Sequence, residues 1–150
     1  MDLVLRSYAE YEPQLDPVEW ANMTAALRRI VGPDAPGIAL VATVLDIVVG
    51  TATYLPAGPR DYRHAPQSWA VVRGMAVDPA WRGRGIGRRL LRECLRRASA
   101  DGVPGVGLHT ASIMTAARAM YESEGFVRDH DFTHLGITFC VYARRQPGPG

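Results

Sequence analysis

The sequence predicts a single domain of the mixed α/β (α+β) class, with a mostly antiparallel central sheet flanked by helices. Two runs of β-branched residues, 38–45 and 47–54, are separated only by Asp46, which predicts a hairpin. Further along, short apolar runs of strand length alternate with two stretches of helical periodicity, 86–98 and 115–124. Strands interrupted by helices in this way are typical of the mixed class. A length of 150 residues suits one domain with a sizeable core.

Composition places the chain among ordinary globular proteins and localises its charge. Hydrophobic residues make up 47% and charged residues 21% of the sequence, and the net charge of +2 is too small to indicate nucleic-acid binding. All 17 basic residues are arginine, and seven of them lie in residues 82–97. Charge gathered in one place suits a single highly charged ligand. Arginine together with abundant Ala, Gly and Pro indicates a GC-rich bacterial genome.

Cysteine usage and hydropathy indicate a cytoplasmic protein. Cys94 and Cys140 are widely separated, and we interpret them as reduced thiols of the core. The N-terminus lacks the basic and apolar regions of a signal peptide. The longest apolar stretch, residues 37–54, has Asp46 in its middle and many β-branched residues, so we expect no membrane span.

The first third of the chain contains one clear helix. Asp16 can cap it, Pro17 suits its first position, and Glu19 completes a capping box. Apolar residues at helical spacing follow up to Ile30, and Gly32 closes the helix. Residues 2–8 show an imperfect alternation that we interpret as a first strand.

The remaining connections follow from turn residues and short apolar runs. Residues 56–66 carry three prolines and are expected to form a loop that faces the substrate. Strands are predicted over 69–77 and 106–110, from Phe126 onward, and over 137–143. The domain is expected to span residues 1–145, and residues 146–150 to form a disordered tail.

A glycine-rich loop between a strand and a basic helix has the features of an anion site. The strand ends at Val77 because Asp78-Pro79 stops it, and the loop runs from Arg82 to Gly87. Glycines allow backbone N–H groups to converge on an anion, and the following helix adds its unpaired N–H groups and the positive end of its dipole. The spacing matches neither a Walker A motif nor the dinucleotide-binding fingerprint, so a different phosphate ligand is indicated.

The motif R-x-x-G-x-G, preceded by M-A-V-D-P-A-W and followed by R-R-L-L, resembles the GNAT superfamily of N-acetyltransferases. The resemblance covers residues 38–143, and the first 37 residues fit loosely, with one helix where the family often has two. It implies the GNAT fold and acetyl-CoA as cosubstrate, with the pyrophosphate on the loop. The coenzyme residues implied are Met75, Ala76 and Val77 along the pantetheine arm, then Arg82, Gly83, Arg84, Gly85, Ile86, Gly87 and Arg88.

The same resemblance supplies a catalytic acid. Residues 117–126, A-R-A-M-Y-E-S-E-G-F, resemble the family segment A-x-x-L-Y-x-x-x-G-F, whose tyrosine protonates the coenzyme thiolate. Tyr121 stands at that position and is protonated at neutral pH. The alternative is a core tyrosine that packs against Phe126. By resemblance, the N–H near Val77 faces the thioester carbonyl.

The general base departs from the family pattern. The strand position that often holds glutamate is Val71, and the position that often holds a coenzyme-contacting asparagine is Met114, so Thr110, Ser112 or Thr115 would replace that contact. His109, His64, Asp61 and Tyr62 are candidates for a base or relay. We expect a water relay with no single essential base.

Two further features of the sequence have possible roles in binding. Trp81 is either a packing residue or a contact on the adenine side. His130, Asp131 and His134 match no known metal spacing, so we expect no metal.

The sequence therefore predicts an N-acetyltransferase that moves an acetyl group from acetyl-CoA to a primary amine by direct attack in a ternary complex. The alternatives are a non-catalytic domain that binds a CoA ester, as a sensor or interaction module, and a nucleic-acid-binding protein that uses its arginine helix. We expect neither a nucleic-acid nor a membrane partner. The acceptor stays open between small amines, antibiotics, peptide N-termini and protein lysines, as does a homodimer.

Overall fold

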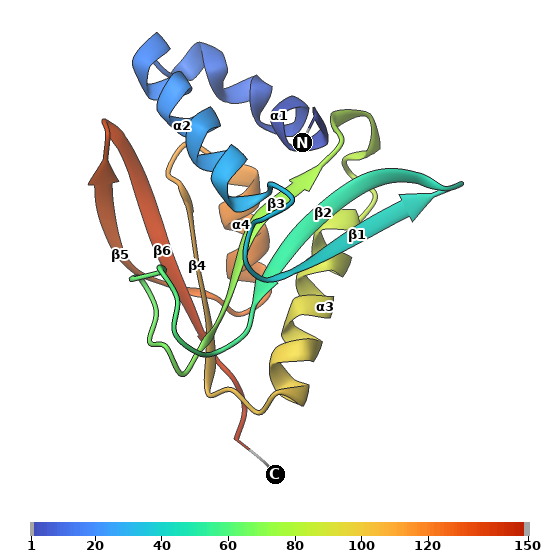
Figure 1. Cartoon of the computed structure of the whole chain (residues 1–150), viewed down its shortest axis with the longest axis vertical. Coiled ribbons are helices and arrows are strands. Elements are labelled where there is room, and N and C mark those ends of the chain that lie inside the picture. The colour runs from blue at the N-terminus through green and yellow to red at the C-terminus, as the bar shows by residue number, and fades with distance from the viewer. Residues whose placement is uncertain (1, 149–150) are drawn as a thin grey trace.

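The chain forms one mixed sheet with helices on both faces (Figure 1). This computed structural model describes residues 2–148, so Pro149 and Gly150 of the predicted tail lie outside the described residues. The elements are α1 (Asp2–Tyr8), the 3-10 helix η1 (Ala9–Gln14), α2 (Pro17–Ile30), β1 (Ile38–Val44), β2 (Ile47–Leu55), β3 (Ala70–Val77), the 3-10 helix η2 (Pro79–Trp81), α3 (Ile86–Ala100), β4 (Gly105–Ala111), α4 (Thr115–Ser123), β5 (Val127–His134) and β6 (Ile137–Arg145). The strand order is β1-β2-β3-β4-β6-β5, and only β3 and β4 are parallel neighbours. The predicted fold class is confirmed.

Two hydrophobic clusters cover opposite faces of the sheet. One cluster joins α3 and α4 to the sheet through residues such as Leu91, Tyr121 and Leu108. The other joins α1 and α2 to the end of the sheet, and its buried members are Val4, Met23, Leu27, Ala76, Ala111, Met114 and Ile137. Cys94 and Cys140 are buried and free, as predicted. Within the described part of the chain, no helix has the length and apolar character needed to cross a bilayer.

The two parallel strands separate soon after they meet. β3 and β4 pair only at Ala70–Val106 and Val71–Gly107. A bulge in β3, where Gly74 has φ +64, adds one residue relative to β2. Beyond it, Met75 packs toward the α3 side and Ala76 toward the α1–α2 side. The sheet is therefore split between the C-terminal halves of β3 and β4.

The prediction of a strand over residues 2–8 is wrong, because this segment is helix α1. Its buried residues Val4 and Ser7 and its partly buried Tyr8 are three and four positions apart, so they share one helical face. The Tyr8 hydroxyl donates to the carbonyl oxygen of Met75 at 3.0 Å, which fixes α1 over β3. The first 37 residues thus hold two α-helices where one was expected.

The predicted capping box and the predicted hairpin are both confirmed. The Glu19 amide donates to Asp16 Oδ1 at 2.8 Å, and the Asp16 amide donates to Glu19 Oε2 at 3.0 Å, which completes the capping box. The hairpin turns at Leu45 and Asp46, whose φ angles are +50 and +64. Two consecutive residues with positive φ are the signature of a type I′ turn, which suits the twist of a hairpin.

Candidate active site

A cleft of about 490 Å³ opens at the split. It is walled by α1 and η1, the end of β3, the glycine loop, the end of β4 and α4. The predicted coenzyme residues lie together along it, with the exception of Arg84, and Tyr121 joins them from α4. The residues of the prediction that line the cleft are Met75, Ala76, Val77, Arg82, Gly83, Gly85, Ile86, Gly87, Arg88 and Tyr121.

The glycines of the loop leave its backbone uncovered by side chains where it lines the cleft. Gly83 and Gly85 have φ angles of +76 and +75, and a Cβ added at either would meet no atom within 4 Å. Glycine is therefore required for the backbone conformation and not for space inside the protein. Gly85 is the N-cap of α3 and offers no side-chain cap. The first N–H groups of α3 and its positive dipole end are thus available to an anion.

The arginines of the loop contact other parts of the protein. Arg82 donates to the Ser7 carbonyl oxygen at 2.6 Å and pairs with Glu10, so it ties the first helices to the loop. Arg84 lies with its guanidinium 4.6 Å from the centre of the Trp81 ring. Trp81 lines the cleft and packs against Arg84, so its position fits both predicted interpretations, a packing residue and a contact on the adenine side.

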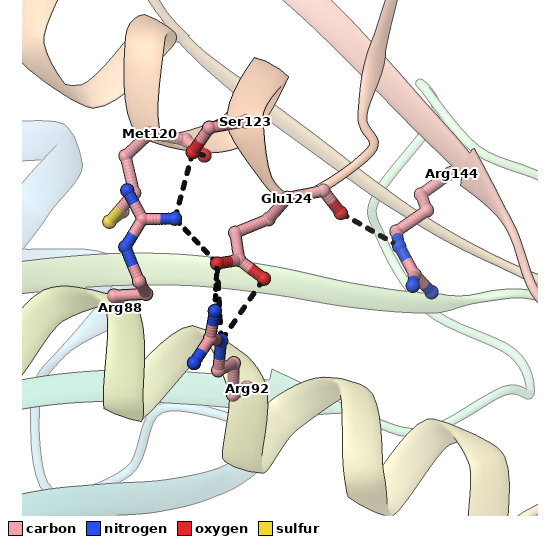
Figure 2. Close-up of polar contacts among 6 residues, drawn as sticks. All are labelled: Arg88, Arg92, Met120, Ser123, Glu124 and Arg144. Carbon is pink, nitrogen blue, oxygen red and sulfur yellow. Dashed lines mark hydrogen bonds and ion pairs between the residues drawn. The ribbon is translucent and has the colours of Figure 1, made fainter.

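Arg88 belongs to an ion-pair network that joins α3 to the end of α4 (Figure 2). Glu124 Oε1 lies 2.5 Å from Arg88 and 3.0 Å from Arg92, and Arg88 also donates to the Ser123 hydroxyl at 2.8 Å. The hydrogen bond from Arg92 is the main reason that the pKa of Glu124 lies below its ordinary value, and Arg88 adds to it. The network holds the helix of the loop against the helix that carries Tyr121.

Tyr121 lies at the meeting point of core and cleft. Its side chain is 7% exposed and packs against Phe126 and Tyr142, with ring centres 6.0 and 6.2 Å away. Its hydroxyl lies 4.0 Å from the Met75 sulfur. Burial raises its pKa well above the ordinary tyrosine value, so the phenol is protonated at neutral pH. Both predicted interpretations of Tyr121, the core residue and the proton donor, fit this position.

The N-terminal helices supply cleft residues that sequence analysis missed. Ser7, Tyr8, Glu10 and Tyr11 all line the cleft. Burial raises the pKa of Tyr8 to about 12, with a smaller contribution from Tyr11. The interpretation of this segment as a strand did not place these residues at the cleft. The available signal was the helical spacing of Val4, Tyr8 and Tyr11.

Of the three residues that could replace the missing asparagine, Thr110 is the one that lines the cleft. Thr110 and Met114 both line the cleft, and the Thr110 hydroxyl lies 3.1 Å from the Met114 sulfur. Ser112 and Thr115 do not line it.

The candidate bases lie on the opposite face of the sheet. Thr110 faces the cleft, so its neighbour His109 faces away, as the alternation of the strand predicts. The Tyr62 hydroxyl lies 3.0 Å from His109 Nδ1, and His64 stacks on Phe132 at 4.0 Å. Burial, followed by the charges of His64 and Arg73, lowers the pKa of His109 to about 4. Burial also lowers the pKa of His64.

The other residues considered in the sequence do not line the cleft. Val71 is buried, while Asp61 is exposed. His130 pairs with Asp129, and Asp131 pairs with Arg128. Among residues 2–148 no group of three His, Cys, Asp or Glu side chains is arranged to hold a metal ion.

Residues 1–126 match the model of a known family, described as the Acetyltransferase (GNAT) family. The chain belongs to the GNAT family. This confirms the resemblance, and the GNAT match extends over the N-terminal helices that the sequence fitted only loosely.

Individual GNAT relatives are similar over parts of the chain. N-alpha-acetyltransferase RimI of Mycobacterium tuberculosis is 53% identical over 57 residues, which are 38% of this chain and 34% of that protein. N-acetylaspartate synthetase of Danio rerio is 37% identical over 70 residues, 45% of this chain and 25% of that protein. The matched segment thus spans about a third or less of the length of these curated relatives. The PaiA N-acetyltransferase of Thermoplasma acidophilum, solved with coenzyme A, superimposes with a TM-score of 0.71 over 97% of this chain and 89% of that chain, at 12% identity, which shows the shared fold.

Proposed function

We propose that this GNAT protein transfers an acetyl group from acetyl-CoA to a primary amine by direct attack in a ternary complex. One observation carries the proposal: a single cleft connects the anion-binding glycine loop to a buried, protonated Tyr121 through the split edge of β3. A coenzyme whose phosphates and thioester lie at opposite ends of a long arm needs such an arrangement.

The cleft supplies a binding group for each part of the coenzyme. The pyrophosphate fits the free N–H groups of the loop and of the first turn of α3. Beyond Val71, the edge of β3 that faces β4 has no strand partner among residues 2–148. Its backbone groups from Met75 to Val77 are therefore available to the amides of the pantetheine arm, apart from the Met75 carbonyl that accepts from Tyr8.

The chemical step follows from these positions. The amine nitrogen attacks the thioester carbonyl carbon, the C–S bond breaks, and the Tyr121 hydroxyl gives its proton to the departing thiolate sulfur. The proton lost by the amine leaves through water and restores the phenol. The backbone N–H near Val77 would stabilise the oxyanion that forms on the way.

The acceptor favoured by the site is an α-amine. The names of two relatives specify an N-alpha-acetyltransferase and the synthesis of an N-acetylated amino acid. Physical chemistry agrees, because a histidine with a pKa of about 4 cannot keep a proton taken from an amine at neutral pH. Without a base, a lysine amine of pKa ~10.4 costs roughly 4.6 kcal/mol to deprotonate at pH 7, whereas a chain α-amine of pKa ~8 costs about 1 kcal/mol.

Calorimetric titration with acetyl-CoA and a thiol-release assay with an amine panel test the proposal together. We expect saturable binding at one site and thiol release that requires both acetyl-CoA and an amine, with the acetylated amine identified by mass. Binding without thiol release across α-amines, lysine peptides and small amines would instead indicate a CoA-ester-binding module.

A further inference from the structure

Arg73 and His109 face each other across the split, on the side away from the coenzyme cleft. The last parallel pair is Val71–Gly107, and both residues come two positions later on their strands, so they lie level with each other. Val72 and Leu108 pack beneath α3 and α4, so the alternation of each strand directs Arg73 and His109 to the other face. There His109 contacts Tyr62 and His64 of the 56–69 loop. An acceptor that approaches the thioester from this side must pass these residues.

Arg73 differs from the other half-buried arginines because its charge has no partner. Within residues 2–148 its side chain makes no hydrogen bond or ion pair, and its Nε is buried without an acceptor. A buried Nε without an acceptor also occurs in Arg60 and Arg97, but every other half-buried arginine has at least one hydrogen bond or ion pair to an oxygen: Arg60, Arg88, Arg97, Arg118 and Arg144. Burial lowers the pKa of Arg73, which reflects the cost of desolvating its charge. An anion that binds the guanidinium would offset this desolvation cost through charge-assisted hydrogen bonds.

Apart from Asp61, the groups around Arg73 are cationic or neutral. Arg60 lies near enough to lower its pKa, and the Arg60 guanidinium is already occupied by backbone carbonyls of Pro56, Pro66 and Trp69. His64 and His109 are neutral at pH 7 because burial lowers both pKa values. Asp61 is an exposed carboxylate near enough to raise the pKa of Arg73, but within residues 2–148 no hydrogen bond or ion pair joins the two side chains.

We propose that Arg73 binds a carboxylate of the acceptor, so that the substrate class is a primary amine that carries a carboxylate within a few bonds, as amino acids do. The inference rests on the proposed acetyltransferase function and names its acceptor. The guanidinium fork matches a carboxylate with two parallel hydrogen bonds. The same positive charge disfavours a nearby ammonium, so it lowers the pKa of the bound amine and helps to supply the neutral form that attacks.

Matched acceptors test this preference in the thiol-release assay. The pairs are alanine with alaninamide, aspartate with asparagine, and peptides that begin with Asp or with Asn. The amine of alaninamide is less basic than that of alanine, so chemistry alone would favour the amide. We expect the carboxylate member of at least one pair to have the higher kcat/KM. The free acids and the peptides show whether the carboxylate belongs to a small molecule or to a chain terminus.

Charge removal at Arg73 completes the test. Arg73→Gln should lower kcat/KM for the carboxylate acceptor roughly 10- to 100-fold and leave the amide within about threefold. Arg63→Gln removes the same charge from an exposed position of the neighbouring loop and should change neither. Melting temperature and acetyl-CoA affinity confirm that each variant is folded with a working cleft.

The outcomes separate the two proposals. Failure to bind acetyl-CoA would reject the acetyltransferase function itself. Normal acetyl-CoA binding with a preference for amides, with equal losses for both acceptor types in Arg73→Gln, or with no turnover of any carboxylate acceptor would overturn only the role of Arg73. If Arg73→Gln does not fold, the kcat/KM values of the wild-type protein for the matched acceptors still test the preference for a carboxylate.

Discussion

Tyr121 shows how one residue can belong to both the core and the reaction. Its ring is buried among aromatic neighbours, while its hydroxyl has only a 4.0 Å contact with the Met75 sulfur. Removing that oxygen should therefore disturb packing very little. The Tyr142 hydroxyl, by contrast, donates to Glu122 and accepts from Arg118, and it lines no part of the cleft.

Tyr121→Phe should lower kcat by ~10²–10⁴-fold, the usual contribution of general acid catalysis. Acetyl-CoA affinity and melting temperature should stay close to those of the parent protein. Tyr142→Phe is the control, because it removes a bonded hydroxyl and should lower the melting temperature while leaving kcat within about threefold. A kcat loss below about twofold in Tyr121→Phe would show that Tyr121 is a core residue only.

His109 should make stability depend on pH in the acid range. Its pKa is about 4 in the folded protein and near 6.5 when exposed, so below pH 6.5 the unfolded chain binds a proton that the folded chain does not. Its neutral form therefore contributes stability above pH 6.5 that is lost as pH falls toward 4, on the order of 3 kcal/mol for a shift of this size. Denaturant unfolding of the parent and of His109→Gln between pH 7 and 4 measures this, and parallel curves for the two proteins would contradict it.

At the scale of elements, the loop–helix unit of residues 82–102 offers a pair of matched glycines. Gly85 and Gly102 have φ angles of +75 and +69, and a Cβ at either position meets no atom within 4 Å. Gly85→Glu and Gly102→Glu thus impose the same backbone strain and the same charge, but only Gly85 lines the cleft. We expect Gly85→Glu to weaken acetyl-CoA binding by at least tenfold, because a carboxylate would repel the pyrophosphate at the helix N-terminus. Calorimetry should show unchanged affinity for Gly102→Glu, and equal losses would mean that the phosphates bind elsewhere.

An element could be predicted from the sequence where the interactions that form it join residues close together in the chain. Helix α2 and the β1–β2 hairpin were predictable because a capping box and a two-residue turn lie within a few residues of sequence. Helix α1 was not, because seven residues carry little periodicity and this segment is held by a distant contact, from Tyr8 to Met75. The cleft residues that α1 carries could therefore not be predicted either. The pairing of Arg82 with Glu10 was hidden for the same reason, since it joins residues 72 positions apart.

At the scale of the molecule, the split between β3 and β4 joins two unlike surfaces. The cleft side holds the glycine loop, Tyr8 and Tyr121, and the opposite side holds Arg73, His64 and His109. The sequence could place His109 and Thr110 on opposite faces from alternation alone. It could not bring residues 62, 64, 73 and 109 together, because that depends on strand order and on how the 56–69 loop folds back over the sheet.

The final prediction concerns the pH dependence of the whole reaction. The pKa values of His64 and His109 lie below their ordinary value, that of Tyr8 lies at about 12, and that of Tyr121 lies above its ordinary value. Because His109 and the two tyrosines titrate outside the range between pH 5 and 8, the ionisation that limits kcat/KM should be that of the acceptor amine. The rate should rise about tenfold per pH unit and level off at the pKa of the amine.

Two acceptors whose amines differ in pKa provide the measurement, since the plateau should move with the acceptor. Replacing His64 or His109 with Gln should leave the shape of each profile unchanged, whatever it does to the absolute rate. If both acceptors instead share an ascending limb near pH ~6.5, and that limb disappears in His109→Gln, then binding of the acceptor has raised the pKa of His109 and the histidine is the base. The water relay predicted from the sequence would then be wrong, and the face that carries Arg73 would hold the base as well as the acceptor.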